Sequence, residues 1–255
     1  MNPLRAIGAG LIALLRSAGA VALFAGQTLA ALVRPPYFAG QLAQQIFKIG
    51  FLSLPVVGLT ALFTGAALAL NIYTGGSRFN AESFVPNIVA MGIVRELGPV
   101  IASLMLAGRV SSGIAAEIGA MRATEQIDAL HTLATDPMRY LIAPRVLAGV
   151  LVLPVLVATA DIIGIYGGFL VSVHTLDFNP TIYVRNTWDF LSDWDIISGL
   201  IKAAVFGFIL TLMGCYHGFY AQGGAQGVGR AATNAVVAAA VLIFAANFLL
   251  TSLFV

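Results

Sequence analysis

Long apolar runs separated by shorter polar segments dominate this chain. A helix that crosses the hydrocarbon core of a membrane needs about 20 predominantly apolar residues, and five runs reach that length. They are Phe51–Leu70, Phe84–Leu106, Val146–Val173, Ile196–Tyr216 and Ala231–Val255. The pattern predicts an all-α integral membrane protein with five transmembrane helices, organised as a single domain over residues 1–255.

An N-terminal region, residues 1–48, precedes these runs. Its stretch Leu11–Val33 is apolar except for Arg16, Ser17, Gln27 and Thr28. We do not expect a cleaved signal peptide, because more membrane protein follows rather than a secreted domain. Hydropathy leaves two alternatives open, a further span or an amphipathic helix that lies in the membrane interface.

A polar segment of helical character lies between the second and third runs. From Ala115 to Leu133, apolar residues recur at three- and four-residue steps and form one small face of a helix. The members of this face are Ala116, Ala120, Ala123, Ile127, Leu130 and Ala134. Asp136-Pro137 ends the helix, since a residue before proline is disfavoured in helical geometry. The pattern predicts a short amphipathic helix that contacts another protein, or else an ordinary solvated helix in a loop.

Basic residues are distributed unevenly across the predicted topology. The side that holds the Ala115–Leu133 helix carries Arg5, Arg16, Arg34, Lys48, Arg109, Arg122, Arg139, Arg145 and Arg230, and the other side carries Arg78 and Arg185. Cytoplasmic segments of membrane proteins carry the excess of Lys and Arg. We therefore expect the amphipathic helix in the cytoplasm and the C-terminus on the opposite side.

Composition narrows the function further. Only 9% of residues are charged and 59% are hydrophobic, which excludes an ordinary soluble domain. The net charge of +2 gives no basis for nucleic-acid binding. No phosphate-binding loop of the G-x-x-x-x-G-K-[ST] type is present, and the sequence offers neither metal-ligand spacing nor a catalytic site. If ATP drives this protein, another chain must bind it.

Charged residues within the apolar runs are costly unless paired or hydrated, so they are candidates for function. Asp161 lies roughly 22 Å from the start of its run and Lys202 roughly 9 Å from the opposite end of an antiparallel run, at 1.5 Å per residue. In a core about 30 Å thick these depths nearly coincide. We predict a structural ion pair between Asp161 and Lys202. A proton-coupled carrier that uses Glu96 and Asp161 is the alternative.

Small residues at four-residue spacing could let helices approach closely in lipid. The pairs are Gly164 with Gly168 and Gly214 with Gly218. With 27 glycines in the chain, they indicate a packed bundle and identify no partner.

Several motifs in the centre of the chain closely resemble the MlaE (YrbE-type) permease family. They are Arg95-Glu96-Leu97-Gly98-Pro99, then AGRVSSGIAAEIGAMRATEQIDAL from Ala107 to Leu130, then Asp136-Pro137 and Ala143-Pro144-Arg145. Members of this family are membrane subunits of ABC transporters that move phospholipids or other lipids between bacterial membranes. The resemblance implies a homodimeric permease of the bacterial inner membrane, with an N-terminal interfacial helix and five spans per subunit.

The same resemblance implies that the amphipathic helix is the coupling helix, which sits in a groove of a cytoplasmic ATPase. The residues it assigns to this contact are Glu117, Gly119, Met121, Arg122, Glu125, Gln126 and Asp128. ATP and Mg would bind the partner ATPase and not this chain. Further implied partners are a periplasmic MCE-domain lipid-binding protein and, as an additional candidate, a small STAS-domain protein.

The resemblance also implies a lipid pocket between two subunits, walled by Leu70, Tyr73, Arg95 and Glu96. Apolar side chains would contact the acyl chains, and the charged pair would contact the headgroup. The implied function is ATP-driven transport of phospholipids that maintains outer-membrane asymmetry. A sterol or other hydrophobic substrate is an alternative within the family, and a gradient-driven secondary transporter is the alternative outside it.

Overall fold

The computed structural model describes residues 3–33, 35, 38–77 and 84–254, and all regular structure in them is helical. The helices are α1 (Pro3–Val33), α2 (Ala39–Ile49), α3 (Leu54–Gly76), α4 (Val85–Gly92), α5 (Gly98–Leu106), α6 (Ser112–Ala123), α7 (Gln126–Thr132), α8 (Ala143–His174), α9 (Pro180–Phe190), α10 (Asp193–Phe219) and α11 (Gly224–Phe254). Single 3₁₀ or π-helical turns join some of them, at Phe51–Ser53, Ile93–Leu97, Ala107–Ser111 and Met138–Ile142. Arg34, Pro36 and Arg78, which the sequence places in connections, lie outside the described residues.

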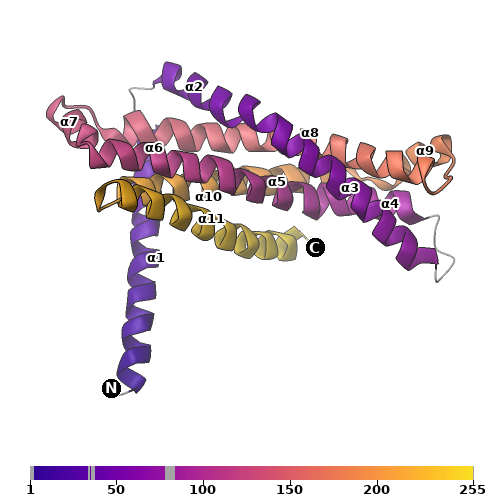
Figure 1. Ribbon diagram of the computed structural model, residues 1–255, viewed down its shortest axis with the longest axis horizontal. Helices are drawn as coiled ribbons and strands as arrows, with labels where there is room; N and C mark the ends of the chain where they lie inside the picture. The colour runs from indigo at the N-terminus through magenta and orange to yellow at the C-terminus, as the bar shows by residue number, and fades with distance from the viewer. Residues whose placement is uncertain (1–2, 34, 36–37, 78–83, 255) are drawn as a thin grey trace.

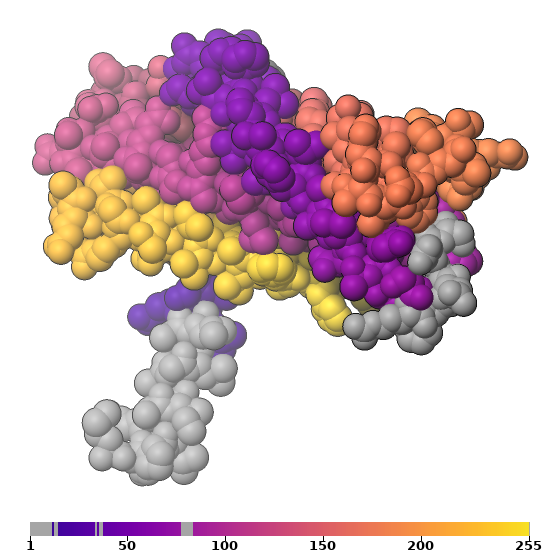
Figure 2. All heavy atoms as spheres, turned by 45° about the vertical axis from the view of Figure 1, so that its right-hand side comes forward, coloured from indigo at the N-terminus to yellow at the C-terminus, as the bar shows by residue number. Residues whose placement is uncertain are grey.

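Five of the long helical segments form a bundle along the longest axis of the molecule (Figure 1). Each of the five predicted spans overlaps a helical stretch that is long and apolar enough to cross a membrane, namely 39–76, 85–123, 138–174, 193–219 and 224–254. Val255, the last residue of the fifth run, lies outside the described residues. The prediction of an all-α integral membrane protein is confirmed. Figure 2 shows α2 and α3 lying obliquely across the surface of this bundle.

Helix α1 runs crosswise to the bundle (Figure 1). Its segment Leu15–Val33 is also long and apolar enough to span a membrane, but a helix set across the other spans fits better in the plane of the interface. Phe24 is buried and fixes α1 to the end of α10, with its ring centroid 5.5 Å from that of Tyr216 and 6.0 Å from that of Phe219. The arrangement supports the interfacial alternative.

The second span is much longer than the apolar run that predicts it. The segments α4, α5 and α6 and the π-helical turns between them form one continuous helical stretch of 39 residues, Val85–Ala123. At 1.5 Å per residue this is about 58 Å, and the hydrocarbon core is about 30 Å thick. The sequence predicts that the second span ends at Leu106 and that a polar segment follows. That prediction is wrong for the first part of the polar segment, because the helix of the second span continues through it to Ala123. We call Val85–Ala123 the central helix.

A short helix in the connection between α8 and α10 is absent from the sequence-based prediction. The Asn179 side chain caps α9 by accepting from the backbone N–H groups of Thr181 and Ile182 at 3.0 and 3.3 Å. Pro180 then starts the helix, a position where proline is favoured. Tyr183 is buried and packs against Phe169 of α8, with ring centroids 5.6 Å apart, so α9 folds back along α8.

Close helix contacts occur at the predicted small residues. A Cβ atom at Gly214 or Gly218 of α10 would lie within 2.9 Å of the backbone of the central helix. A Cβ atom at Gly164 or Gly168 of α8 would lie 3.3 or 3.4 Å from a backbone carbonyl oxygen of α3. The predicted close approach is confirmed, and these contacts hold α3, α8, α10 and the central helix in one tight core.

Candidate functional site

A buried lysine organises a polar cluster inside the bundle. Lys202 of α10 is 2% exposed, and its Nζ donates to Glu96 Oε1 at 2.7 Å and to Thr251 Oγ1 at 2.8 Å. The second carboxylate oxygen, Glu96 Oε2, accepts from Asn247 Nδ2 at 2.9 Å. The central helix, α10 and α11 thus meet in one hydrogen-bonded network, which offsets the cost of removing both charges from water.

Pro99 explains a further contact of this lysine. Proline has no N–H, so the carbonyl of Arg95 four residues earlier lacks its usual α-helical donor. Lys202 Nζ donates to this carbonyl oxygen at 2.9 Å. The Arg95 side chain turns to another neighbour, with its Nε 3.6 Å from Asp195 Oδ1 at the start of α10. Arg95 and Glu96 both lie in the π-helical turn Ile93–Leu97, a feature often found at functional sites.

The predicted ion pair between Asp161 and Lys202 is wrong. The two side chains do lie at nearly the same depth, because they contact Gly98 and Glu96, which are two residues, or about 3 Å, apart along one helix. Lys202 Nζ is directed to Glu96 and to the carbonyl of Arg95 instead, so the two charges meet different residues of the central helix. Asp161 Oδ1 lies against Gly98 and has no hydrogen-bond partner among the described residues.

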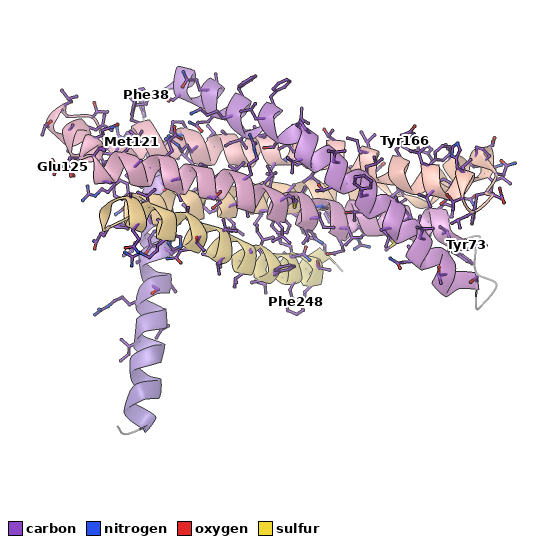
Figure 3. All side chains as sticks on the ribbon, in the orientation of Figure 1. Phe38, Tyr73, Met121, Glu125, Tyr166 and Phe248 are labelled. Atoms are coloured by element: carbon purple, nitrogen blue, oxygen red, sulfur yellow. The ribbon has the colours of Figure 1, made fainter. Side chains whose placement is uncertain are left out.

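Leu70 and Tyr73, the other residues assigned to a lipid pocket, lie near the end of α3 that is farther from α7; Tyr73 is labelled in Figure 3. Leu70 is 42% exposed, and Tyr73 packs edge-on against Phe178 with ring centroids 6.1 Å apart. A cavity between α3 and α5, lined by Thr64 and Leu97 among others, has a volume of about 10 Å³. Such a space holds one water molecule at most. The lipid-binding role of the four residues stays a prediction.

At the opposite end of the bundle, the predicted single helix Ala115–Leu133 is two helices joined at an angle. The central helix ends at Ala123 and α7 begins at Gln126. Glu125 between them has a φ of 59°, a left-handed conformation that stops an α-helix. Arg122 Nη1 bonds Asp128 Oδ1 at 2.6 Å across the bend. We call the segment Arg122–Thr132 the elbow; Figure 3 labels Glu125 near its tip.

The residues predicted for ATPase contact separate into two groups. Glu125, Gln126 and Asp128 are exposed on the elbow. Gly119 is buried instead, because it packs against Ala221 and Val228, and Met121 is half-buried. The expected apolar face is also only partly internal, since Ile127 is buried while Ala120, Ala123 and Ala134 are exposed. A role in ATPase contact stays a prediction for all seven residues.

Glu117 belongs to a charge cluster at the base of the elbow. Its Oε2 lies 3.1 Å from Arg145 Nη2, and its Oε1 lies 3.2 Å from Lys48 Nζ. The Arg145 side chain is 6% exposed and also donates to the carbonyl of Leu141 at 2.7 Å. These contacts connect α2, the central helix and α8, so Glu117 fixes the position of the helix from which the elbow extends.

Sequence reasoning missed the partners of these charges. Asn247 and Thr251 are four residues apart in the uncharged apolar run Ala231–Val255, and this spacing places both on one face of a helix, which was a usable signal. Asp195 is not among the predicted site residues, although it forms a reciprocal capping box with Ser192 at the start of α10. Arg145 stands in the recognised Ala143-Pro144-Arg145 motif, but its carboxylate partner depends on how α8 packs.

Comparison with known proteins bears on what this arrangement does. The chain matches the model of the family described as Permease MlaE over residues 42–253. It is 50% identical over 254 residues to a probable ABC transporter permease protein of Rickettsia felis, which covers 100% of this chain and 98% of the relative. It is 37% identical over 213 residues to the intermembrane phospholipid transport system permease protein MlaE of Haemophilus influenzae, covering 83% of this chain and 82% of the relative. The chloroplastic protein TRIGALACTOSYLDIACYLGLYCEROL 1 of Arabidopsis thaliana is 37% identical over 234 residues, covering 92% of this chain and 67% of the relative.

Proposed function

The chain belongs to the MlaE permease family, a family of ABC transporter permeases, and from this premise we propose that it moves phospholipids between the inner and outer membranes of a bacterium. This transport would maintain the lipid asymmetry of the outer membrane. The relative from Haemophilus influenzae is named as an intermembrane phospholipid transport permease, which supports this substrate. The chain would bind no nucleotide itself, and a cytoplasmic ATPase would supply the energy with ATP and Mg.

The central helix is the observation that carries the proposal. One continuous helical stretch holds the Glu96 cluster near one end and leads into the elbow at the other. A helix transmits displacement along its axis because its backbone hydrogen bonds resist stretching. Movement of the elbow by an ATPase would therefore reach Arg95 and Glu96 directly. This provides a physical path from ATP hydrolysis to a lipid pocket without a nucleotide site in this chain.

The exposed tip of the elbow has the chemistry that a docking element needs. Glu125 and Gln126 are exposed, and Arg122 and Asp128 form a partly exposed ion pair beside them. Charged groups at the rim of an interface fix its orientation, and the small side chains of Ala120 and Ala123 would permit close approach. We propose that this surface enters a groove of the ATPase.

Two copies of the chain would form the transporter. Leu70 is 42% exposed and the side chain of Glu96 is 37% exposed, so a lipid pocket walled by Leu70, Tyr73, Arg95 and Glu96 needs a second surface. A homodimer supplies that surface. The other proposed partners are a periplasmic MCE-domain protein and a small STAS-domain protein. The elbow would face the cytoplasm of a cell with an inner membrane, and the C-terminus would face the periplasm.

The competing function is a gradient-driven carrier, and Asp161 is the observation that favours it. Its buried Oδ1 has no hydrogen-bond partner among the described residues, and such a carboxyl is suited to bind a proton. A sterol or other hydrophobic substrate would suit the same fold. The two functions differ in their source of energy, which is ATP hydrolysis by a partner chain for the ABC permease and an ion gradient for the carrier. The test therefore compares the chain with and without its partners.

The experiment is to purify the chain from its native host, identify the proteins that accompany it, and measure phospholipid-dependent ATPase activity in nanodiscs. We expect an ATPase in the complex, and we expect Glu125→Arg to reduce the lipid-stimulated activity while the complex stays folded. Arg185→Gln is the matched control, because Arg185 is exposed at the opposite end of the bundle and pairs only with Asp189 among the described residues.

Transport by the purified chain alone, driven by a proton gradient and abolished by Asp161→Asn, would overturn the proposal. Retention of full lipid-stimulated ATPase activity by Glu125→Arg would remove the elbow from the coupling mechanism. Stimulation by sterols but not by phospholipids would replace the substrate and leave the ATPase assignment intact.

A further inference from the structure

A cavity lined by cations lies between α2 and the central helix, at the end of the bundle that carries the elbow. Its volume is about 360 Å³. Gln45, Lys48 and Arg109 contribute polar lining, and Leu52 and Ile114 are among the apolar lining residues. We call it the α2–α6 cavity. It is separate from the Leu70, Tyr73, Arg95 and Glu96 set, none of which lines it.

The charge around this cavity is positive. Glu117 also lines it, but its carboxylate is already bound by Arg145 and Lys48 at 3.1 and 3.2 Å. Arg109 has no acidic partner among the described residues, and its Nη1 donates to the neutral hydroxyl of Ser53. Three cations thus stand around a single carboxylate. A half-buried arginine without a counter-ion favours an anionic ligand, above all one that accepts several hydrogen bonds, as a phosphate does.

The depth of the cavity matches the membrane surface. Lys202, which binds Glu96, lies six residues, or about 9 Å at 1.5 Å per residue, inside the run Ile196–Tyr216. Arg109 follows Glu96 by 13 residues on the central helix, or about 20 Å. The two distances add up to about 29 Å, and the hydrocarbon core is about 30 Å thick, so Arg109 lies at the depth of lipid headgroups on the side of the elbow. Lys48 lines the same cavity, and Leu52 and Ile114 offer apolar surface beside it.

We propose that the α2–α6 cavity binds a membrane phospholipid, with its phosphate held by Arg109 and Lys48 and the first methylene groups of its acyl chains against Leu52 and Ile114. The combination of cations with an apolar wall selects a lipid over free phosphate, because a free ion gains nothing from the apolar side. This site goes beyond the transport function, since it belongs to one chain and needs neither an ATPase nor a second subunit.

The test is photolabelling of the purified full-length chain in a neutral detergent. The probe is phosphatidylglycerol with a diazirine near the glycerol end of one acyl chain, and mass spectrometry locates the label. We expect the label on Leu52, Val110 or Ile114, which are apolar residues that line the cavity. Unlabelled phosphatidylglycerol should compete, whereas diacylglycerol, which lacks the phosphate, and inorganic phosphate, which lacks the chains, should not compete at the same concentration.

Two variants test the chemistry and the space separately. Arg109→Gln should reduce labelling about tenfold, the effect of losing one charge-assisted bond. Gly113→Leu keeps every charge but fills the cavity, since Gly113 lines it and a Cβ there meets nothing within 4 Å. Gly108→Leu is the matched control, because a Cβ at Gly108 also meets nothing within 4 Å and Gly108 does not line the cavity.

Equal labelling of the wild type, Arg109→Gln and Gly113→Leu would overturn the proposal. Competition by inorganic phosphate as strong as that by phosphatidylglycerol would make it a site for free anions, and competition by diacylglycerol would remove the role of the phosphate. If Arg109→Gln fails to fold, Gly113→Leu and Gly108→Leu still decide the outcome. Because the assay contains no ATPase, its failure leaves the proposed transport function untouched.

Discussion

Lys202 Nζ lies 2.7 Å from Glu96 Oε1, and this contact joins α10 to the central helix. The lysine is almost wholly buried, while the side chain of Glu96 is 37% exposed. Charges in such a position are retained only where each has a partner. The pair therefore fixes the π-helical turn that carries Arg95 and Glu96 relative to α10 and α11.

Removing one member of this pair should destabilise the protein more than removing both. We expect Lys202→Met to lower the free energy of unfolding by about 2 kcal/mol, less than the 3–5 kcal/mol for a fully buried pair because Glu96 is partly hydrated. The double variant Glu96→Gln/Lys202→Met should recover most of the loss. Thermal unfolding in detergent measures both. Additive losses in the double variant would show that the two residues act independently.

Gly98 should not tolerate any side chain. A Cβ at this position would overlap Asp161 Oδ1 and lie 2.9 Å from the carbonyl oxygen of Ile93. We expect Gly98→Ala to cost about 2 kcal/mol, as overpacking does, and Asp161→Ala to recover part of it. Asp161→Asn is the control, since it removes the charge but not the volume and should give no recovery. Chemical unfolding of Gly98→Ala, alone and combined with each Asp161 substitution, checks this, and equal recovery by Asn would mean that charge rather than space is decisive.

The left-handed conformation of Glu125 should matter apart from its charge. Glycine adopts a positive φ without strain, whereas a β-branched residue there is strongly disfavoured. We expect Glu125→Gly to preserve the elbow and Glu125→Val to loosen α7 by about 1–2 kcal/mol. Hydrogen exchange of the α7 amides measures this directly. Similar exchange in the two variants would mean that the bend is set by contacts outside Glu125.

The attachment of α1 should depend on Phe24. Burial of this ring against Tyr216 and Phe219 is worth about 3 kcal/mol on the scale of Phe→Ala substitutions in protein cores. We expect Phe24→Ala to detach α1 locally and to leave the bundle folded. Limited proteolysis between α1 and α2 should then accelerate. The neighbouring Leu23 is 71% exposed, so Leu23→Ala should not change the cleavage rate.

The spans and the family were accessible from the sequence because they depend on local properties. A run of about 20 apolar residues must cross the membrane or be buried whatever its neighbours are, and each of the five runs is helical in the structure. The ordered motif from Arg95 to Arg145 identified the family for a similar reason, because such a motif is recognised from the order of its residues alone. Helix ends were less accessible. The predicted second span ended at Leu106, before the charge of Arg109, but Arg109 donates to Ser53 and the helix continues to Ala123.

Partners of the charged groups could be decided only by the tertiary structure. Glu96 and Lys202 are 106 residues apart in the chain, and depth alone placed Asp161 equally well beside Lys202. Depth follows from residue count, but the side of a helix that a neighbour occupies follows from how the helices rotate and pack. By itself the sequence determined the class of protein, its spans and its family. The packing of the central helix against α8 and α10 decided which carboxylate Lys202 meets, because it brings Glu96 to Lys202 and places Asp161 against Gly98.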